Sequence, residues 1–510
     1  MKHSSLLCCA ALLIGAALSS CGNTAAVQSP AETGSSAPVP ADTDAVVTEQ
    51  VQKASLPQTM DLGGRDFTVL TKIFGNDVNG RWTSLDFMER EYDGDAVNDA
   101  FLDRNLKLEE LFHCHIVNVF TDIGDMFSYK IYQTVSKYIL SGDSTYDFIM
   151  PTIQDCAKLS ADGMLLPLND YHVIHLDAPW WNQTFSDATT IGENTYYADG
   201  DISETFIRAA YAIFFNKQAV TDYDLDDPYQ LVTDRLWTTD RMMEMSRAAA
   251  EDLNGNGYMD SEDRVGLLLL NNSGEALYAA SDAQLVTAQK DGTLTWTGSS
   301  ARSIAVMEKI GQMYRDSLTV LNCDDMKLML GESRQLSNTD RAAAIFSNGY
   351  ALFMFGTMTN VNSLRGMETD FGILPLPMND STQDRYYSYI HTWSASAAAI
   401  PITASAPEES AAFMEAAAYY AKEIITPAYY DTALKTKYAR DEASKAMLDL
   451  IYENRWSDLG NLYNIGKILT TVSDMFVKGK DTFTSTLAKN ESKIASELED
   501  INNSLIASIQ

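Results

Sequence analysis

The feature that most constrains the fold is an alternation of strand-like and helix-like segments early in the chain. Short apolar runs typical of strands occupy residues 66–71, 115–121 and 146–151. Between them, residues 98–113 and 125–142 have the periodicity of amphipathic helices. Neighbouring parallel strands need long crossover connections, which are usually helical. The sequence therefore predicts an α/β fold in which helices cover a mainly parallel sheet.

Size, composition and charge narrow the class of protein. The chain has 510 residues, and the part after residue 59 is too long for one ordinary domain, so two or more lobes are expected. Hydrophobic residues make up 45% of the chain, which is enough for large buried cores. Acidic residues number 70 against 37 basic ones, for a formal net charge of -33. This balance argues against a nucleic-acid partner, which needs a basic face, and suits an exterior or cation-binding protein.

The N-terminus resembles that of a bacterial lipoprotein precursor. Lys2 precedes an apolar run of signal-peptide length, which ends in LSSC at residues 18–21. This tetrapeptide resembles the lipobox, so residues 1–20 are predicted to be a signal peptide and Cys21 the lipidated mature N-terminus, held on the extracellular face of the cell membrane. Residues 21–59 are rich in Ala, Ser, Thr and Pro, which is typical of a flexible tether. The alternative is an ordinary secretory signal with an incidental cysteine.

The order of motifs along the rest of the chain resembles the extracellular solute-binding proteins of bacterial ABC importers. The closest resemblance is to large, maltose-binding-protein-like lipoproteins with sugar-type ligands, and it covers nearly the whole chain after Met60. The matching segments, in order, are YDFIMP (146–151), GMLLPLNDY (163–171), TYYADGD (195–201), AAYAIFFNKQ (209–218), AAAIFSNGYALFMFG (342–356), DFGILPLPM (370–378), YYSYIHTWSASAAAIP (386–401) and PEESAAFMEAAAYYA (407–421).

The resemblance implies a two-lobed periplasmic-binding-protein-like fold, with each lobe a mainly parallel sheet flanked by helices. It implies a first lobe from residues 60–200 with about 392–428, and a second lobe from 201–391 with about 429–510. Hinge crossings join the lobes, and a small ligand, with a sugar or oligosaccharide favoured, binds in the cleft between them. The implied partners are the permease subunits of an ABC importer, and the implied state is a monomer with no catalytic cofactor.

Ligand contacts are expected where strands end toward the cleft. A sugar offers hydroxyl groups and flat CH faces, so aromatic rings and carboxylate or amide groups recognise it. Trp82 and Trp393 could instead fill a lobe core, and Asp199 and Asp201 could instead cap a turn. The candidate ligand residues, in chain order, are Phe74, Asn76, Asp77, Trp82, Gln154, Asp155, Asp199, Asp201, Phe355 and Trp393.

Residues 252–263, with the sequence DLNGNGYMDSED, have the spacing of a calcium-binding loop. Residues 238–251 before it are typical of a helix and residues 264–271 after it of a buried strand, so the helix pair of a calcium sensor is missing. We expect a structural calcium ion here. The alternative is an acidic turn held by side-chain to backbone hydrogen bonds without a metal. The expected ligands are Asp252, Asn254, Asn256, Tyr258 through its carbonyl, Asp260 and Asp263.

The sequence lacks common enzyme motifs, so it gives little support to a catalytic function. The sequence has no GxSxG, HExxH or GxxxxGK[ST] motif. His113 and His115 flank Cys114, but no further ligand cluster accompanies them, so a metal site is not expected there. The alternative function is a secreted carbohydrate-active hydrolase, because so acidic a chain has many carboxyl groups that could form the pair such an enzyme needs. A surface adhesin would predict repeats, and the sequence has none.

Overall fold

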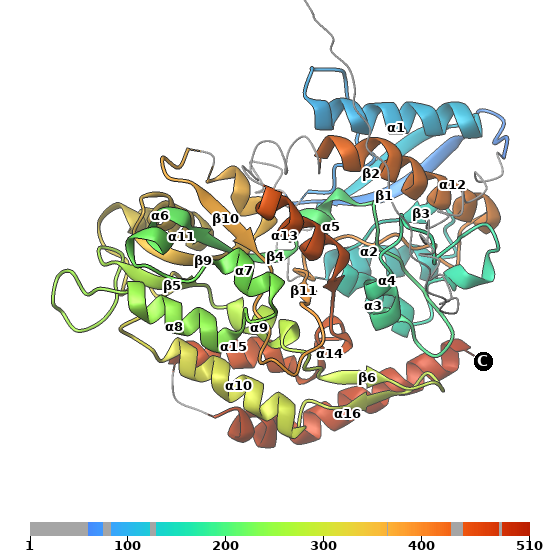
Figure 1. Cartoon of the computed structure of the whole chain (residues 1–510). Coiled ribbons are helices and arrows are strands. Elements are labelled where there is room, and N and C mark those ends of the chain that lie inside the picture. Colours follow the sequence, from blue (N-terminus) through green and yellow to red (C-terminus); the bar gives the residue numbers. More distant parts are fainter. Residues whose placement is uncertain are drawn as a thin grey trace, which may run out of the picture. The chain divides into compact units, whose positions relative to one another are not determined.

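The computed structural model of the protein describes most of the chain after residue 59 (Figure 1). The chain divides into two compact units, residues 1–53 and 54–510, and all described residues belong to the second unit. Cys21, with the predicted signal peptide and tether, therefore lies outside the described residues, as do Asn76, Asp77 and Trp82. The described ranges are 60–74, 83–122, 129–364, 366–429, 442–478 and 482–509, and no helix within them is long and apolar enough to cross a bilayer.

The predicted strand–helix alternation forms a three-stranded parallel sheet. Its strands are β1 (Asp66–Ile73), β2 (His115–Asp122) and β3 (Phe148–Ile149), in the spatial order β2-β1-β3. Helices α1 (Ala96–Phe112) and α2 (Lys130–Leu140) provide the crossovers between these strands. β1 can lie at the centre of the sheet because its side chains Phe67, Val69 and Leu70 are fully buried.

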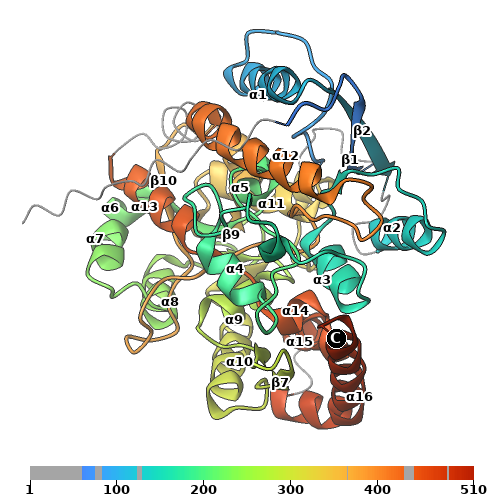
Figure 2. The same ribbon diagram turned by 90° about the vertical axis from the view of Figure 1, so that its right-hand side faces the viewer.

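A segment from much later in the chain completes the first lobe. Helix α12 (Pro407–Tyr420) lies beside α1 (Figures 1 and 2). Its Phe413 ring stacks on Phe67 of β1 with centroids 4.0 Å apart. Ala399 forms an antiparallel bridge with Ile149 of β3. The first sheet is therefore completed by residues 250 or more positions away in sequence, as expected of a lobe that is discontinuous in the chain.

The second sheet has five strands and mixed direction. Its order is β10-β4-β9-β5-β8, for strands β10 (Phe371–Leu374), β4 (Tyr211–Asn216), β9 (Ala351–Thr357), β5 (Val265–Leu269) and β8 (Val320–Asn322). β4 is antiparallel to both of its neighbours, whereas β5 is parallel to β9 and β8. Every residue of β4, β5, β9 and β10 is buried, which explains their continuous apolar sequences.

Helices surround the second sheet and continue to the C-terminus. Helix α8 (Thr239–Ala249) and strand β5 confirm the helix and the strand predicted on either side of the 252–263 loop. The other elements are α3 (Ile153–Ala161), η1 (Leu168–Asp170), α4 (Gln183–Thr189), α5 (Glu204–Arg208), α6 (Lys217–Asp222), α7 (Pro228–Thr233), α8 (Thr239–Ala249), α9 (Ser273–Ala280), β6 (Val286–Ala288), β7 (Leu294–Trp296), α10 (Ala301–Tyr314), η2 (Gly331–Gln335), α11 (Asn338–Ser347), η3 (Met358–Asn362), β11 (Ser388–Tyr389), the π-helical turn η4 (Ala421–Ile425), α13 (Glu442–Glu453), β12 (Arg455–Trp456), α14 (Leu459–Leu462), η6 (Ile465–Lys467), α15 (Ile468–Lys478) and α16 (Phe483–Ile509).

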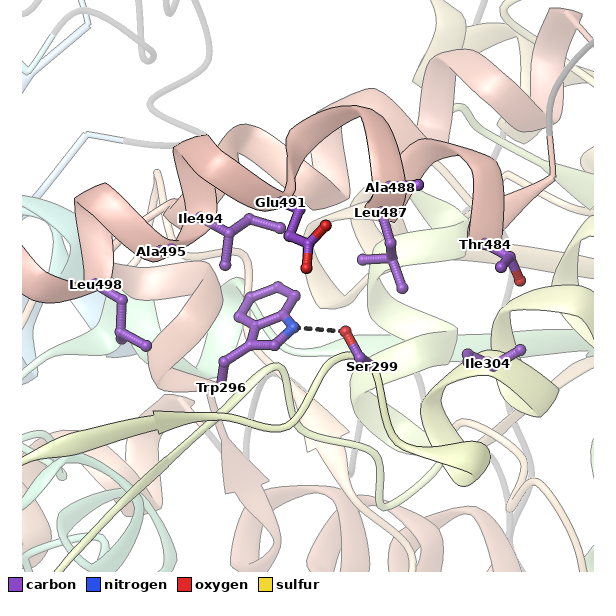
Figure 3. A pocket seen from close by; sticks show the side chains of 10 residues that line it. All are labelled: Trp296, Ser299, Ile304, Thr484, Leu487, Ala488, Glu491, Ile494, Ala495 and Leu498. Atoms are coloured by element: carbon purple, nitrogen blue, oxygen red, sulfur yellow. Dashed lines mark hydrogen bonds between the residues drawn. The ribbon is translucent and has the colours of Figure 1, made fainter.

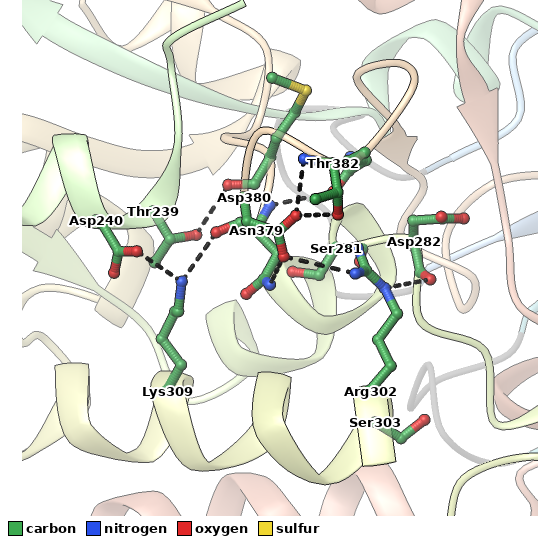
Figure 4. Close-up of polar contacts among 12 residues, drawn as sticks. Thr239, Asp240, Ser281, Asp282, Arg302, Ser303, Lys309, Asn379, Asp380 and Thr382 are labelled. Carbon is green, nitrogen blue, oxygen red and sulfur yellow. Dashed lines mark hydrogen bonds and ion pairs between the residues drawn. The ribbon is translucent and has the colours of Figure 1, made fainter. Parts of the chain in front are cut away.

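Polar contacts fix α10 against the loop that follows β10 (Figure 4). Lys309 of α10 places its Nζ 2.8 Å from Asp240 Oδ2 and donates to the Asn379 carbonyl oxygen at 2.9 Å. About two turns away on the same helix, Arg302 forms an ion pair with Asp380 at 3.5 Å. These contacts hold α10 at a defined position next to α9 and α16.

The chain passes between the two sheets at two neighbouring places. Ala198 forms a bridge with Ala398, and Ala210 forms one with Ile390. β11, which belongs to the second crossing, pairs in parallel with β12. The crossings therefore lie side by side, and the ends of both sheets meet next to them.

Candidate functional site

A hydrogen-bonded group of side chains lies where the two crossings meet the ends of α3, α9 and α14. Gln154 Nε2 donates to Thr392 Oγ1 at 3.0 Å and to the Asn461 carbonyl oxygen at 3.2 Å. Asn461 Nδ2 donates to Glu275 Oε1 at 2.6 Å. The Tyr389 hydroxyl donates to the same Glu275 oxygen. We call these five residues the interlobe cluster, because they connect the helix after the first sheet with the helix after β5.

Three of the cluster residues, Gln154, Glu275 and Asn461, lie near the starts of helices. Gln154 is the second residue of α3, whose N-cap Thr152 accepts the Asp155 N–H at 3.0 Å. Glu275 lies in the first turn of α9, which follows the buried strand β5. Asn461 lies in α14, where Asp458 Oδ1 accepts the Asn461 N–H at 3.0 Å. Each side chain therefore leaves a helix at its N-terminal end, close to the carboxyl end of a strand or to a crossing.

Burial shifts the pKa values of titratable side chains in and next to the cluster. Removal from water raises the pKa of Glu275 to about 7, although the Tyr389 hydroxyl bond opposes this shift. Burial likewise raises the pKa of Tyr389 well above its usual value and lowers that of His391, two residues further on, to about 4. Near neutral pH the Glu275 carboxyl thus exists in both protonation states, and it can donate or accept a hydrogen bond.

One acceptor of the cluster has no partner among the described residues. Gln154 is only 1% exposed, and its Oε1 accepts no hydrogen bond there. A buried carbonyl oxygen without a donor costs about 1–3 kcal/mol. A ligand hydroxyl could supply that donor, so Gln154 has the capacity for one further hydrogen bond.

Aromatic rings gather beside the cluster. Tyr211 stacks on Phe355 and on Tyr389, with centroids 5.0 and 5.9 Å apart. Trp393 meets Tyr129 edge to face at 4.8 Å. Rings and hydrogen-bonding groups thus occur together at the crossings, which is the combination that a sugar requires.

The predicted ligand residues near the crossings occupy different environments. Gln154 belongs to the cluster and Trp393 lies beside it, whereas Phe355 is buried beneath Tyr211. Phe74 is 8% exposed at the end of β1, with the Lys72 ammonium 5.8 Å from its ring centroid.

The hydrogen bonds of Asp155 give it a structural role. Its carboxylate accepts from the Thr152 hydroxyl at 2.7 Å and from the Tyr132 N–H at 3.2 Å. It therefore joins the start of α3 to the start of α2. Burial raises the pKa of Asp155 to about 6 despite these bonds.

Asp199 and Asp201 take no part in the hydrogen bonds that define the interlobe cluster. Asp199 is fully buried, accepts from Asn182 Nδ2 at 3.4 Å, and has a pKa raised well above its usual value by burial. Asp201 accepts from the Tyr452 hydroxyl at 2.5 Å and borders a cavity of about 430 Å³ with Trp181 and Arg455. Gln154 thus bonds within the cluster and Trp393 lies beside it, whereas these two aspartates bond to other residues.

Four of the five cluster members were not among the predicted ligand residues. Glu275 follows a predicted buried strand by four residues, so the rule that selected Gln154 could have found it. Tyr389 and Thr392 lie within residues 388–394, the predicted second crossing, from which only Trp393 was selected. Asn461 gives no local signal, because its position depends on the return of the C-terminal segment to α3.

The 252–263 loop is folded around its side chains. The Asp252 carboxylate accepts backbone N–H groups from Gly255, Asn256 and Gly257 at 2.7, 3.2 and 2.8 Å. Gly255 and Gly257 have φ of 72° and 88°, in the left-handed region that glycine tolerates. Asp252 therefore organises the first half of the loop.

Side chains at loop positions 3, 5 and 9 converge. Asn254 Nδ2 and Asn256 Nδ2 donate to Asp260 Oδ2 at 2.9 and 2.7 Å. Asp263 closes the loop by accepting the N–H groups of Leu253 and Asp260, both at 2.9 Å. Tyr258 extends an exposed side chain. Across the described ranges, no group of three or more His, Cys, Asp or Glu side chains is close enough to hold a metal, so an ion here would need the asparagine amide oxygens and a backbone carbonyl in addition to the aspartates.

The histidines of the HCH sequence have carboxylate partners. His113 Nδ1 lies 2.9 Å from Asp61, and His115 Nδ1 lies 3.0 Å from Glu109. Cys114 between them is a partly buried free thiol. These contacts account for both imidazoles without a metal.

Comparison with known proteins identifies the fold. No protein-family profile and no curated protein sequence matches this chain. Solved structures do match. An ABC substrate-binding protein from Listeria monocytogenes in complex with cycloalternan has a TM-score of 0.54 and 12% identity, over 86% of this chain and 99% of that chain.

Two further solved structures have the same architecture. The GacH receptor of Streptomyces glaucescens, solved unliganded and with acarbose, has a TM-score of 0.53 and 12% identity, over 86% of this chain and 99% of that chain. A cyclo/maltodextrin-binding protein complexed with maltotetraose has a TM-score of 0.54 and 13% identity, over 85% and 97% of the two chains. The predicted two-lobed periplasmic-binding-protein-like fold is confirmed.

Proposed function

We propose that this chain is a solute receptor that captures a sugar or oligosaccharide between its lobes and delivers it to an ABC importer. The observation that carries the proposal is the interlobe cluster, which joins Gln154 of α3 to Glu275 of α9 beside the aromatic rings of the crossings. The structural neighbours were solved with cycloalternan, acarbose and maltotetraose, which favours the same ligand class here.

The chemistry of the cluster fits hydroxyl recognition. Gln154 Oε1 lacks a donor among the described residues, and Glu275 can donate or accept near neutral pH. Trp393 and Tyr129 offer ring surface beside them. A hydrolase would need two carboxyl groups astride the scissile bond, and the cluster as defined contains one. Binding without bond cleavage is therefore the better proposal.

Binding of maltotetraose to the purified protein tests the proposal. We expect maltotetraose to raise the melting temperature, since it binds the native state only. Gln154→Ala should weaken its affinity about tenfold or more, because the variant loses both the amide donor and the free acceptor. Gln230→Ala, on the exposed face of α7, is the matched control.

Two results would count against the proposal. If neither maltotetraose nor acarbose nor a cyclodextrin changes the melting temperature, the ligand is not a sugar of this class. If they bind but Gln154→Ala and Asn461→Ala bind them as wild type does, the site lies elsewhere.

We propose in addition that acylated Cys21 anchors the protein on the outer face of the cell membrane. The lipobox-like LSSC sequence and the tether-like composition of residues 21–59 support this, although both lie outside the described residues. Cys21→Ser should move the protein from the membrane fraction to the soluble fraction. Retention of the variant on membranes after a high-salt wash would contradict the anchor.

We also propose that the 252–263 loop binds one structural calcium ion. The convergence of Asn254, Asn256 and Asp260 on one point supports it, because an ion there would replace the two hydrogen bonds that now join these side chains. The ion would join α8 to β5 and take no part in ligand binding.

A further inference from the structure

A second cavity lies apart from the interlobe cluster, between the last long helix and the hairpin that precedes α10 (Figure 3). Its volume is about 420 Å³, within the range of small-molecule sites. β7 provides Trp296, the start of α10 provides Ile304, and α16 provides the opposite wall. The lining residues are Trp296, Ser299, Ile304, Thr484, Leu487, Ala488, Glu491, Ile494, Ala495 and Leu498.

The two walls of this groove are fixed to each other. Asn502 of α16 donates to the Leu294 carbonyl at 3.0 Å and accepts the Leu294 N–H at 2.7 Å, so it joins the helix to β7. Gly466 N–H donates to Glu497 Oε2 at 2.5 Å and fixes the same helix to η6. The groove is therefore formed before any ligand arrives, which reduces the entropy cost of binding.

The indole of Trp296 is also held in place. Its Nε1 donates to Ser299 Oγ at 2.9 Å. A Cβ built on Gly298 would lie 2.5 Å from the ring, so the ring packs directly over that glycine. The indole N–H is thus already used, and the ring face is what remains for a ligand.

The opposite wall combines apolar side chains with one carboxylate. Leu487, Ile494 and Leu498 lie on one face of α16, spaced seven and four residues apart. Glu491 stands among them and points into the groove toward Trp296 (Figure 3). Of the two lysines on this helix, Lys493 is paired with Glu497 at 3.6 Å, and Lys489 also has an interaction partner. Within the described part of the chain, no hydrogen bond or ion pair reaches the Glu491 carboxylate, and the groove lining contains no cation.

We infer that this groove binds a small organic cation with an apolar body. The ammonium group would lie between the Trp296 ring face and the Glu491 carboxylate, where cation–π attraction and charge pairing act together. The apolar body would cover Leu487, Ile494 and Leu498. The aliphatic wall disfavours a sugar, whose hydroxyl groups would lose water there without partners. The net charge of -33 raises the local concentration of cations around the protein.

A pair of matched probes tests the inference with the whole protein. Phenethylammonium and 2-phenylethanol share the same apolar body and differ at the terminal group. By calorimetric titration at pH 7 we expect the ammonium to bind at least tenfold more tightly than the alcohol. Glu491→Gln should abolish that preference, because it removes the charge and keeps the shape. Glu499→Gln, an exposed acid on the same helix that does not line the groove, should leave the preference intact.

Three results would overturn the inference. The first is equal affinity of the wild type for both probes, which would leave only a generic apolar groove. The second is an unchanged preference in Glu491→Gln. The third is an unchanged affinity for the ammonium in Trp296→Leu that melts as wild type does. If Trp296→Leu fails to fold, the Glu491→Gln comparison still decides, because that side chain is exposed and its replacement leaves the fold intact.

Discussion

At the scale of single residues, Asp458 positions the part of the interlobe cluster that comes from the C-terminal segment. Its Oδ2 accepts the Leu285 N–H at 2.8 Å and its Oδ1 accepts the Asn461 N–H at 3.0 Å. The side chain is 1% exposed, and burial raises the pKa of Asp458 from 3.8 to about 7 although these N–H groups oppose the shift. Between these two pKa values, the native state therefore keeps a proton on Asp458 that the unfolded chain has lost.

We predict a specific pH dependence from this shift. Between pH 4 and 7 the native chain binds more protons at Asp458 than the unfolded chain, so stability from this group falls as pH rises. The full contribution is present below the unfolded pKa and is lost as pH passes the folded pKa. Relative to Asp458→Asn, which cannot titrate, the wild type should lose roughly 2–4 kcal/mol between pH 4 and pH 8. Thermal melts across this range measure it.

The control for this prediction is an exposed acid. Asp187→Asn, on the solvent side of α4, should leave the pH profile parallel to that of the wild type. A parallel profile for Asp458→Asn as well would show that Asp458 does not titrate in this window.

Gly200 allows an approach of two backbones next to the first crossing. The Asp201 N–H donates to the Trp180 carbonyl at 2.9 Å, and a Cβ on Gly200 would lie 2.0 Å from that oxygen. No side-chain rotation can relieve a clash with backbone. We therefore predict that Gly200→Ala lowers stability by about 3 kcal/mol or more, measured by thermal melting. Gly366→Ala, whose added carbon meets nothing within 4 Å, should change it little, and equal melting of the two variants would contradict the packing argument.

At the scale of elements, hydrophobic periodicity predicted the strands and helices around the first sheet but not their limits. The helix expected over 98–113 begins at Ala96, because Asp95 accepts the N–H groups of Val97 and Asn98 and so caps it earlier. The second sheet was expected to be mainly parallel, and β4 lies antiparallel to both neighbours. The direction of a strand depends on which neighbours it pairs with. A fully buried strand such as β4 is apolar along its whole length, so its sequence does not show whether it runs parallel or antiparallel to them.

The 252–263 loop provides a prediction at the same scale. Calcium should raise the melting temperature, because the ion would add bonds between the end of α8 and the start of β5 that the unfolded chain lacks. Asp252→Ala combined with Asp263→Ala should erase this gain while leaving maltotetraose affinity nearly unchanged. Equal melting curves in calcium and in chelator would exclude the ion. A large loss of sugar affinity in the double variant would instead assign the ion to the ligand site.

At the scale of the whole molecule, hydrophobic periodicity could not predict the contacts between segments that are distant in sequence. Ala399 pairs with Ile149, Phe413 stacks on Phe67, and Asn461 accepts from Gln154, each across more than 200 residues. Only the resemblance to two-lobed binding proteins predicted that the chain returns to its first sheet. The limits of the two lobes remain predictions, as do the ligand contacts.

The same long-range contacts lead to a prediction about closure. Gln154 belongs to α3, beside the first sheet, whereas Asn461 belongs to α14, which Asp458 ties to the segment that starts β6. If the lobes separate by a hinge motion at the crossings, the bond from Gln154 to Asn461 is among those that must break or be replaced by ligand. In small-angle scattering, maltotetraose should then reduce the radius of gyration of the wild type. Without sugar, Gln154→Ala should have the larger radius, because it lacks the bond to Asn461 that favours the closed arrangement, and Gln230→Ala should match the wild type. An unchanged radius at saturating sugar would exclude a hinge mechanism, while the calorimetric affinity would still decide whether the sugar binds.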